Sequence, residues 1–399
     1  MKILLLLSLY SFIWCQTEVG SENTLDIMTW NLKEFPYNGT VTVDYVADLI
    51  TSSNLDIIAL QEISSSNDFQ QLINDLNDSE SQYSWEGFRS GNSNWSLAYI
   101  INTSTVIISE APYPILNNYY NYFAYRVPGV IEITYADELF FIINNHFKCC
   151  GDGIIQNDYW DEEYRRQQAS IYLKDYIDTH LPDENVIVLG DLNDELTDSE
   201  ENNVFWNFLS DLDEYLFVDM EIAQGSPEYW SYPTYSTSGS HIDHILITDE
   251  LFNHVSEIQT VLYDLDNDGD SDLDDWYTYH NYISDHRPVH ISLCATECDM
   301  GIVDDTKIFN PQDYIILNTY PNPFNPSTNI TVNISLGGQV YIHIYNIAGQ
   351  VIARLGGDYL TPGTYQYIWH ANHLPSGIYI VRAELNNKKS MLKKVIKIN

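Results

Sequence analysis

The sequence predicts two folded parts: an α+β domain with two packed sheets flanked by helices, followed by a small all-β, immunoglobulin-like sandwich. Two observations carry this prediction. Short apolar runs alternate with a few helical stretches from residue 25 to residue 293, which is typical of layered α+β domains. Beyond residue 317, only short runs of alternating apolar and polar residues remain, separated by Gly and Pro turns.

The α+β part contains eight strand-like runs rich in Val, Ile and Leu, as buried strands are. They span Leu25–Trp30, Leu55–Leu60, Leu97–Ile101, Val130–Thr134, Leu139–Asn144, Val186–Leu189, Ile245–Thr248 and Val289–Leu293. The clearest helical stretches are Val43–Thr51, Phe69–Leu76 and Glu162–Thr179. Eight or more strands with few helices favour two packed sheets with the helices outside.

The C-terminal part has four clear alternating runs, at Ile330–Ser335, Val340–Asn346, Tyr365–Trp369 and Ile378–Glu384. This pattern predicts strands with one face in a small core. No cluster of chemically reactive residues occurs here. We expect its histidines to be ordinary surface or turn residues; they are His343, His370 and His373.

The N-terminus has the pattern of a secretory signal peptide. Lys2 is followed by a mostly apolar run from Ile3 to Trp14, and polar residues begin at Gln16. The run is too short for a membrane span, and no other stretch is a candidate span. We expect cleavage before Gln16. Cys15 admits a lipoprotein as the alternative, which the bulky Trp14 before it disfavours.

Four cysteines remain after the signal peptide: Cys149, Cys150, Cys294 and Cys298. An exported chain meets oxidising conditions, so we expect pairing, although four cysteines allow three connectivities. Stapling of loops is the expected role. Metal ligation by Cys149 and Cys150 is disfavoured because no second pair of soft ligands has zinc spacing.

The net charge of −40 is distributed unevenly along the chain. Residues 16–305 hold 54 of the 57 acidic residues against eight Lys and Arg, whereas residues 306–399 hold three acidic and eight basic residues. The acidic part therefore lacks the basic surface of a typical nucleic-acid-binding protein. We attribute the charge to solubility and salt adaptation, and expect cations to mediate any binding of a polyanion.

Six short polar clusters each lie at or near the end of an apolar run. A carboxylate or imidazole just past a buried strand lies at the rim of a sheet, where rigid backbone holds it in place. The clusters are Trp30-Asn31, Gln61-Glu62, Asn145-His146, GDLND at 190–194, HIDH at 241–244 and SDHRP at 284–288. Their mixture of oxygen ligands and histidines indicates metal-assisted cleavage of a phosphoester.

Together the six clusters resemble the endonuclease/exonuclease/phosphatase superfamily, which includes deoxyribonuclease I, abasic-site endonucleases and sphingomyelinases. The resemblance covers residues 24–295, and GDLND followed by SDHRPV is its most specific part. It implies a four-layered α/β sandwich whose two sheets meet at the active site.

The C-terminal part resembles a type IX secretion sorting domain. The resemblance rests on YPNPFNP at 320–326, YNIAGQ at 345–350, PSGIY at 375–379 and the lysine-rich end. It implies export across an outer membrane by the type IX secretion machinery, often followed by removal of the domain. A retained adhesive module is the alternative.

Phosphodiester hydrolysis needs an activated water and neutralised phosphate charge, which Mg²⁺ or Mn²⁺ supplies when oxygen ligands hold it. We predict Glu62 and Asp285 as metal ligands, with Asn31 beside Glu62 to orient phosphate or metal. Taken alone, either acid would be read as a solvated strand end, so this prediction depends on the whole set of clusters.

The predicted catalytic residues include two histidines, which donate to phosphate oxygens or act as acid or base near neutral pH. The resemblance pairs His286 with Asp243, which would fix its tautomer, and brings His146 from the other sheet. It also implies Asp191 as the water-activating carboxylate and Asn193 as a donor to the transition state. His241 and His244 receive no role, since one of them is expected to face the core.

Two features distinguish this sequence within the superfamily. Deoxyribonuclease I-like members carry a glutamate that supports the first histidine, whereas this chain reads Asn94-Trp95-Ser96 there. Conversely, Tyr125-Arg126-Val127-Pro128 resembles the Arg-x-Pro element of nucleases, and Asn145-His146-Phe147-Lys148 resembles the Asn-His-x-Lys of secreted bacterial nucleases. We therefore expect Arg126 and Lys148 to bind substrate phosphate.

A separate loop has the spacing of a calcium site. Acids occupy its alternate positions and glycine its sixth, as in an EF-hand or dockerin loop. The predicted Ca²⁺ ligands are Asp264, Asp266, Asp268, Asp270, Asp272 and Asp275. Position 12 is Asp instead of Glu, which should weaken binding, and a solvated acidic loop is the alternative. A structural role is expected, because the loop precedes Asp285.

The leading prediction is a secreted, divalent-metal-dependent nuclease, expected to be monomeric. A lipid phosphodiesterase like sphingomyelinase, or a sugar or inositol phosphatase, is the alternative, and a non-catalytic surface binding protein is disfavoured. The predicted parts are a signal peptide (1–15), a catalytic domain (16–298) with the calcium loop (264–275), a linker (299–317) and the sorting domain (318–399).

Overall fold

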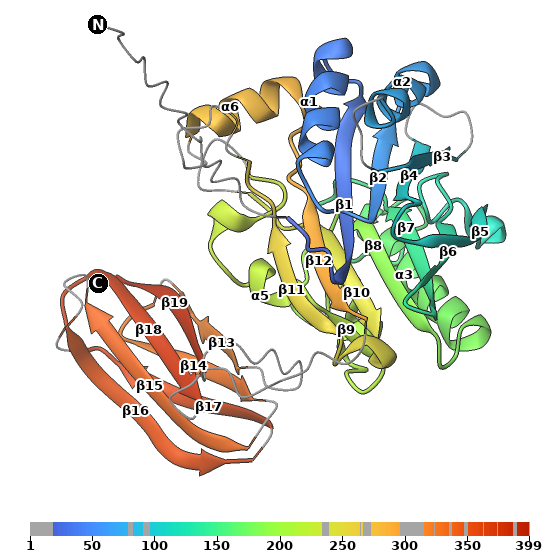
Figure 1. Cartoon of the computed structure of the whole chain (residues 1–399). Helices are drawn as coiled ribbons and strands as arrows, with labels where there is room; N and C mark the ends of the chain where they lie inside the picture. The colour runs from blue at the N-terminus through green and yellow to red at the C-terminus, as the bar shows by residue number, and fades with distance from the viewer. Residues whose placement is uncertain are drawn as a thin grey trace, which may run out of the picture. The chain divides into compact units, whose positions relative to one another are not determined.

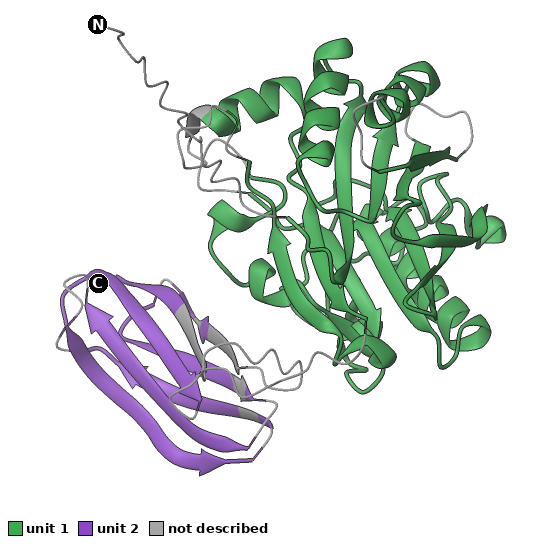
Figure 2. Cartoon of the chain, in the orientation of Figure 1, with its two compact units in different colours: residues 1–309 green, residues 310–399 purple. Residues whose placement is uncertain are grey.

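The structure is a computed structural model in which the chain divides into two units, residues 1–309 and 310–399 (Figure 2). The predicted signal peptide and residues 299–314 of the predicted linker lie outside the residues that the structure describes. Those residues are 19–78, 83–90, 96–233, 239–263, 265, 273–295, 315–322, 324–334, 337–346, 350–361, 363–372, 374–385 and 389–398.

One sheet of the first unit has six strands in the order β11-β12-β1-β2-β4-β3 (Figure 1). Only the central pair, β1 and β2, is parallel. The strands are β1 (Thr24–Phe35), β2 (Ile57–Ile63), β3 (Trp85–Arg89), β4 (Ser96–Asn102), β11 (Val255–Thr260) and β12 (Val289–Cys294).

The second six-stranded sheet repeats this plan in the order β5-β6-β7-β8-β10-β9, with β7 and β8 as its parallel central pair. Its strands are β5 (Ile107–Pro114), β6 (Gly129–Tyr135), β7 (Glu138–His146), β8 (Asn185–Asp191), β9 (Tyr215–Phe217) and β10 (Asp243–Thr248). Each parallel pair brings two carboxyl ends of strands to the same edge of its sheet.

The two sheets pack face to face, and helices cover their outer faces (Figure 1). Ile27 of β1 packs in the core between the sheets, whereas its neighbour Met28 packs in the core under the helices. Central strands are thus buried on both faces, which explains why they appear in the sequence as continuous apolar runs. The predicted four-layered α/β sandwich is confirmed.

Three of the described helices pack on each outer face. The core beneath α1 (Thr40–Thr51), α2 (Ser66–Leu76) and α6 (Leu273–Tyr282) belongs to the first sheet, and that beneath α3 (Glu162–His180), α4 (Trp206–Leu209) and α5 (Met220–Ala223) belongs to the second. Single 3-10 turns lie at η1 (Asn117–Tyr119), η2 (Pro227–Tyr229) and η3 (Asp249–Leu251). Among the described residues, no helix is long and apolar enough to cross a membrane.

The second unit contains only strands among its described elements. One sheet has the order β13-β14-β17 and the other β16-β15-β18-β19. The strands are β13 (Ile315–Tyr320), β14 (Ser327–Ile334), β15 (Gly338–Asn346), β16 (Val351–Leu360), β17 (Gly363–His370), β18 (Gly377–Leu385) and β19 (Lys389–Lys397). A core of its own, which includes Phe324, Trp369 and Tyr379, confirms the all-β prediction.

Candidate active site

Polar side chains from both sheets meet where β1, β2, β7 and β8 end and β10 begins. In the second sheet, His146 is paired with Asp191, and Asp191 is paired with Asp243, so the three lie in one row across neighbouring strands. The side-chain nitrogen of Asn31, where the regular pairing of β1 with β2 is interrupted, donates to Asp191 Oδ2 over 2.9 Å. This hydrogen bond joins the two sheets at the site.

Glycine is required where the two parallel strands of the second sheet approach each other. Gly190 pairs with Asn145 and has φ of +137°. A Cβ atom at this position would lie 2.0 Å from the carbonyl oxygen of Asn145. The glycine of the GDLND motif therefore allows β8 to deliver Asp191 beside His146.

His286 is held by a carboxylate. Its Nδ1 lies 2.8 Å from Asp243 Oδ2, and because a carboxylate only accepts hydrogen bonds, Nδ1 carries a proton and donates it. Burial alone would lower the pKa of His286, but the charges of Asp243 and Asp191 raise it to about 10. The ring is therefore an imidazolium at neutral pH, with Nε2 also protonated.

Asp191 is buried at the centre of the site. Its Oδ2 lies 3.5 Å from His146 Nε2 and 4.0 Å from His286 Nε2. Burial, and then repulsion by Asp243, raises the pKa of Asp191 to about 7. A carboxylate with such a pKa can accept a proton from water near neutral pH.

Glu62 and Asn31 contribute from the first sheet. Glu62 has φ of +61°, a conformation that non-glycine residues rarely adopt, and its Oε2 accepts a hydrogen bond from the amide of Glu34. Its Oε1 lies 3.4 Å from Asn31 Nδ2 and 3.8 Å from His146 Nε2. Asn31 Oδ1 accepts from the amide of Lys33, so Asn31 presents nitrogen, not oxygen, to Glu62 and Asp191.

His146 is a neutral imidazole in this environment. Burial, followed by repulsion from Arg126 and His286, holds its pKa well below the ordinary value. Its Nδ1 has no hydrogen-bond partner among the described residues. Of the segment that replaces the supporting glutamate, Asn94 and Trp95 lie outside the described residues, and Ser96 is buried in β4.

Asn193 adopts φ of +56°, and its backbone amide donates to Asp191 Oδ1 over 3.1 Å. Its side-chain nitrogen points back to the carbonyl of Phe147 over 3.3 Å. The GDLND turn thus places Asn193 next to the carboxylate of Asp191 and fixes the orientation of that carboxylate.

The three remaining predicted residues are engaged in other contacts. Asp285 pairs with Lys33 over 2.9 Å at a partly exposed position. Arg126 donates to the carbonyls of His146 and Phe147, so it supports the backbone that carries His146. Lys148 donates to the carbonyl of Cys149 and lies 3.8 Å from Glu162.

The donor set fits a divalent cation. Three carboxylates, Glu62, Asp191 and Asp243, contribute to one site, and hard divalent ions prefer such oxygen ligands. Asp243 is fully buried, and its Oδ1 has no hydrogen-bond partner among the described residues. Charge neutralisation by a cation would relieve the repulsion between these acids.

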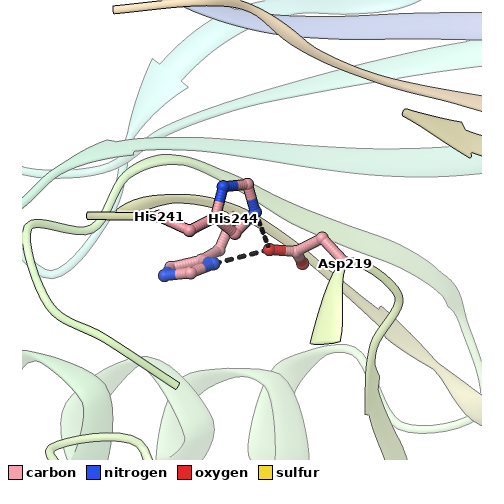
Figure 3. A group of neighbouring side chains, drawn as sticks. All are labelled: Asp219, His241 and His244. Carbon is pink, nitrogen blue, oxygen red and sulfur yellow. Dashed lines mark hydrogen bonds and ion pairs between the residues drawn. The ribbon is translucent and has the colours of Figure 1, made fainter. Parts of the chain in front are cut away.

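Sequence reasoning missed a second buried cluster, formed by Asp219, His241 and His244 (Figure 3). Asp219 Oδ2 lies 2.9 Å from His241 Nε2 and 2.5 Å from His244 Nδ1. The signal for the two histidines was present in HIDH, but nothing in the sequence indicates that Asp219, at the end of β9, joins them.

Hydrogen bonds fix the protons of this cluster. The amide of Ser231 donates to His241 Nδ1, so a neutral His241 must carry its proton on Nε2, which faces Asp219. His244 Nε2 faces the carbonyl of Asp194 and its Nδ1 faces Asp219, so both nitrogens must donate. With every ring nitrogen thus engaged, the cluster is a hydrogen-bonded ion pair, and neither histidine offers a free lone pair to a metal.

The cluster supports the active site from behind. Ser231, which donates to His241, also accepts hydrogen bonds through its hydroxyl from the amides of Ile242 and Asp243. His244 holds the carbonyl of Asp194 in the GDLND turn. The network therefore positions both the carboxylate that pairs with His286 and the turn that follows Asp191.

Of the predicted calcium ligands, only Asp275 lies within the described residues. It is buried near the start of α6, and its Oδ1 accepts a hydrogen bond from the amide of Leu265 over 2.6 Å. The other predicted ligands lie outside the described residues: Asp264, Asp266, Asp268, Asp270 and Asp272.

Comparison with known protein families agrees with the fold. Residues 28–286 match the Endonuclease/Exonuclease/phosphatase family, which covers more than half of the chain. The chain therefore belongs to this family of hydrolases. Residues 318–398 match the Secretion system C-terminal sorting domain, which indicates secretion or attachment at the cell surface.

Solved structures of similar proteins include a humanized D. rerio TDP2 with 14 mutations, which has 13% identity and a TM-score of 0.49 over 68% of this chain and 98% of that chain. An endonuclease/exonuclease/phosphatase from Beutenbergia cavernae has 13% identity and a TM-score of 0.47 over 94% of this chain and 100% of that chain. One from Bacteroides vulgatus has 13% identity and a TM-score of 0.48 over 68% and 99%. No curated protein matches the chain.

Proposed function

We propose that this chain is an exported, divalent-metal-dependent nuclease that hydrolyses phosphodiester bonds of extracellular nucleic acid. The observation that carries the proposal is the meeting of His146, Asp191, Asp243 and His286 with Glu62 at the junction of the two sheets. This set combines a carboxylate that can accept a proton, an imidazolium that can donate one, and oxygen ligands for a cation.

In the proposed reaction, the carboxylate of Asp191 accepts a proton from the attacking water, since its pKa is about 7. The imidazolium of His286 donates a hydrogen bond to the phosphate, and Asp243 keeps that ring protonated and oriented. The neutral His146 lies on the other side of Asp191 and can donate from Nε2. A divalent cation near Glu62, when bound, would neutralise phosphate charge.

The proposal for a nucleic-acid substrate rests on five exposed aromatic side chains, here called the aromatic surface: Tyr119, Tyr120, Tyr125, Tyr159 and Trp160. Within this set, the ring of Tyr120 lies next to that of Tyr125, and the ring of Tyr159 next to that of Trp160. Tyr125 is 62% exposed and Trp160 is 69% exposed. Rings of this kind stack on the bases of single strands regardless of sequence, with about 1–3 kcal/mol per base. Such stacking suits an acidic protein with few basic residues.

The aromatic surface is connected to the site along the chain at two points. Tyr125 directly precedes Arg126, whose guanidinium holds the carbonyl of His146. Trp160 lies two residues before Glu162, which pairs with Lys148. We therefore propose that a single nucleic-acid strand stacked on these rings places its phosphate backbone near Arg126 and Lys148.

The proposal is tested on a panel of substrates with Mg²⁺: a single-stranded oligodeoxynucleotide, the matching RNA, plasmid DNA, sphingomyelin vesicles and a sugar phosphate. We expect cleavage of nucleic acid, with Tyr125→Ala and Trp160→Ala each raising KM for the oligonucleotide by about tenfold. Tyr359→Ala, an exposed tyrosine of the second unit, is the matched control. Turnover of vesicles or sugar phosphate without nucleic-acid cleavage would favour the lipid phosphodiesterase or phosphatase alternative.

Export and calcium binding also follow from the sequence of this chain as proposals of ours. We propose that residues 1–15 are a signal peptide, that the type IX machinery recognises residues 318–399, and that the exported enzyme is a monomer. We also propose that the acidic loop 264–275 binds a structural Ca²⁺, with support from Asp275, whose carboxylate turns back toward Leu265 within that loop.

A further inference from the structure

Two adjacent thiols lie on the segment that follows His146. Cys149 and Cys150 are free and exposed, and their sulfur atoms are 2.9 Å apart. The third described cysteine, Cys294, is disulfide-bonded, and neither Cys149 nor Cys150 is its partner. Among the described cysteines, each of these two thiols therefore has only the other as a neighbour with which it can pair.

The backbone around the thiols is held rigidly. The buried guanidinium of Arg166 donates to the carbonyls of Lys148 and Cys150, over 2.7 and 2.6 Å. The same guanidinium pairs with Asp194 over 2.7 Å and with Glu163 over 3.3 Å. These contacts fix the carbonyl groups on both sides of the thiol pair, so the backbone that carries the two side chains is held in place.

The next residue leaves the loop little room to change. Gly151 has φ of +119°, and a Cβ atom there would lie 2.0 Å from a carboxylate oxygen of Glu163. Glu163 also accepts a hydrogen bond from the amide of Gly153. The turn that follows the thiols is thus closed on α3, the helix that carries Arg166.

The thiols also contact a residue of the proposed substrate site. Lys148 donates through Nζ to the carbonyl of Cys149, and its Nζ lies 3.6 Å from the Cys149 sulfur. Lys148 follows His146 by two residues on the same segment. A change at the sulfur atoms would therefore act directly on the position of the lysine ammonium group.

We propose that Cys149 and Cys150 form a reversible redox site, which closes into a disulfide between adjacent residues after export and alters how Lys148 meets the substrate. A thiolate of the pair attacks the disulfide of an oxidant, such as oxidised glutathione, and the second thiolate displaces the bound thiol. The oxidant gains two electrons as two thiols, and two protons leave the cysteines. To reach the bonded distance of about 2.05 Å, the sulfur atoms need a shift of less than about 1 Å.

Thiol mapping tests this proposal without any activity measurement. The purified full-length protein is equilibrated with oxidised glutathione, alkylated, digested and analysed by mass spectrometry before and after reduction. We expect the peptide that holds both cysteines to resist alkylation and to be lighter by two hydrogen atoms, with alkylation restored by reduction. Direct alkylation of both thiols, a stable glutathione adduct or a cross-linked dimer would overturn the proposal.

The coupling to Lys148 rests on the proposed function and is measured separately, with the oligonucleotide as probe. Oxidised and reduced wild type should differ in KM by at least about threefold, a change of about 0.7 kcal/mol. The variants Cys149→Ser and Cys150→Ser should not respond to the redox buffer. Equal KM values in the two forms, with the disulfide shown by mass, would refute the coupling, whereas absence of hydrolysis in both would refute the proposed nuclease activity.

Discussion

His286 lies near two buried carboxylates, and Asp243 and Asp191 together keep its ring protonated at neutral pH. The same neighbourhood raises the pKa of Asp191 to about 7. Both pKa values are raised, so that Asp191 titrates near neutral pH while His286 stays protonated, and the pair can supply a base and an acid to one reaction. The chemistry of the site therefore follows from burial and from the spacing of like and unlike charges.

Asp243→Asn tests the role of the carboxylate behind His286. The substitution keeps the shape of the side chain but removes the charge that raises the pKa of His286. We expect kcat for the oligonucleotide to fall by about 10²–10³ with little change in KM, because the imidazolium acts mainly in the transition state. Asp137→Asn, at an exposed turn, is the control. An Asp243→Asn enzyme with kcat close to wild type would contradict the role of Asp243 in keeping His286 protonated.

Asp56, at the start of β2, gives a pH dependence of stability. Burial raises its pKa to about 6, above the value of about 3.9 for an unfolded chain. The folded state therefore binds this proton more tightly than the unfolded chain. The resulting contribution to the free energy of unfolding is complete below about pH 4 and is lost as the pH rises through 6. We expect Asp56→Asn to increase the free energy of unfolding at pH 8 by on the order of 2 kcal/mol, and to have no such benefit at pH 4.

Urea denaturation at the two pH values provides the measurement for Asp56. The amide oxygen of asparagine can still accept the hydrogen bond that Asp56 receives from the amide of Asp26, so the comparison isolates the charge. Equal effects of the substitution at pH 4 and pH 8 would show that burial of this carboxylate carries no charge penalty.

At the scale of elements, the strands that build the site could be predicted because burial on two faces leaves an apolar run in the sequence. The run Leu55–Leu60 overlaps the first part of β2, and the run Val186–Leu189 lies within β8. The ends of these two strands carry Glu62 and Asp191. The edge strands β3, β5 and β9 could not be predicted in this way, since they are short or largely exposed. Such strands form because a neighbouring strand offers hydrogen bonds, which no local pattern reveals.

At the site, the contacts between residues far apart in the sequence could not be predicted either. The residue types in GDLND and SDHRP predict their chemistry, but not that Asn31 turns its nitrogen toward Asp191. Nor does the sequence show that Asp219 contacts His241 and His244, which lie 22 and 25 residues further along the chain. These pairings depend on the register between strands and on the turns between them.

Removal of calcium tests the acidic loop before α6. If loop 264–275 binds Ca²⁺, excess EGTA should lower Tm by about 4 °C or more, because an ion that binds only the folded state stabilises it by mass action. Asp275→Asn should lower Tm in calcium and should remove most of the response to EGTA. Identical melting curves with and without EGTA would show that the loop is a solvated acidic segment.

At the scale of the whole molecule, the site and the sorting sequence lie in different units. All predicted catalytic residues lie within the 28–286 match, whereas the sorting match begins at residue 318. The first unit has three hydrophobic cores of its own, and the second has a fourth. Catalysis and export are therefore expected to depend on separate parts of the chain.

A fragment of residues 16–305 tests this separation. Because its cores and its site lie within the first unit, we expect kcat and KM within about twofold of the full-length protein under the same salt and Mg²⁺ conditions. Export of the fragment in a host with type IX secretion should fail. A folded fragment without activity would show that the C-terminal unit contributes to the reaction.

The central claim is that the residues around Asp191 and His286 hydrolyse phosphodiester bonds with the help of a divalent cation. The most direct test measures cleavage of a labelled oligonucleotide by wild type and by His286→Ala, with Mg²⁺ and with excess EDTA. We expect wild type to cleave only with Mg²⁺, and His286→Ala to be at least about 10²-fold slower. His180→Ala, which changes an exposed histidine of α3, should match wild type. Cleavage that survives EDTA, or a His286→Ala rate equal to wild type, would contradict the proposed mechanism.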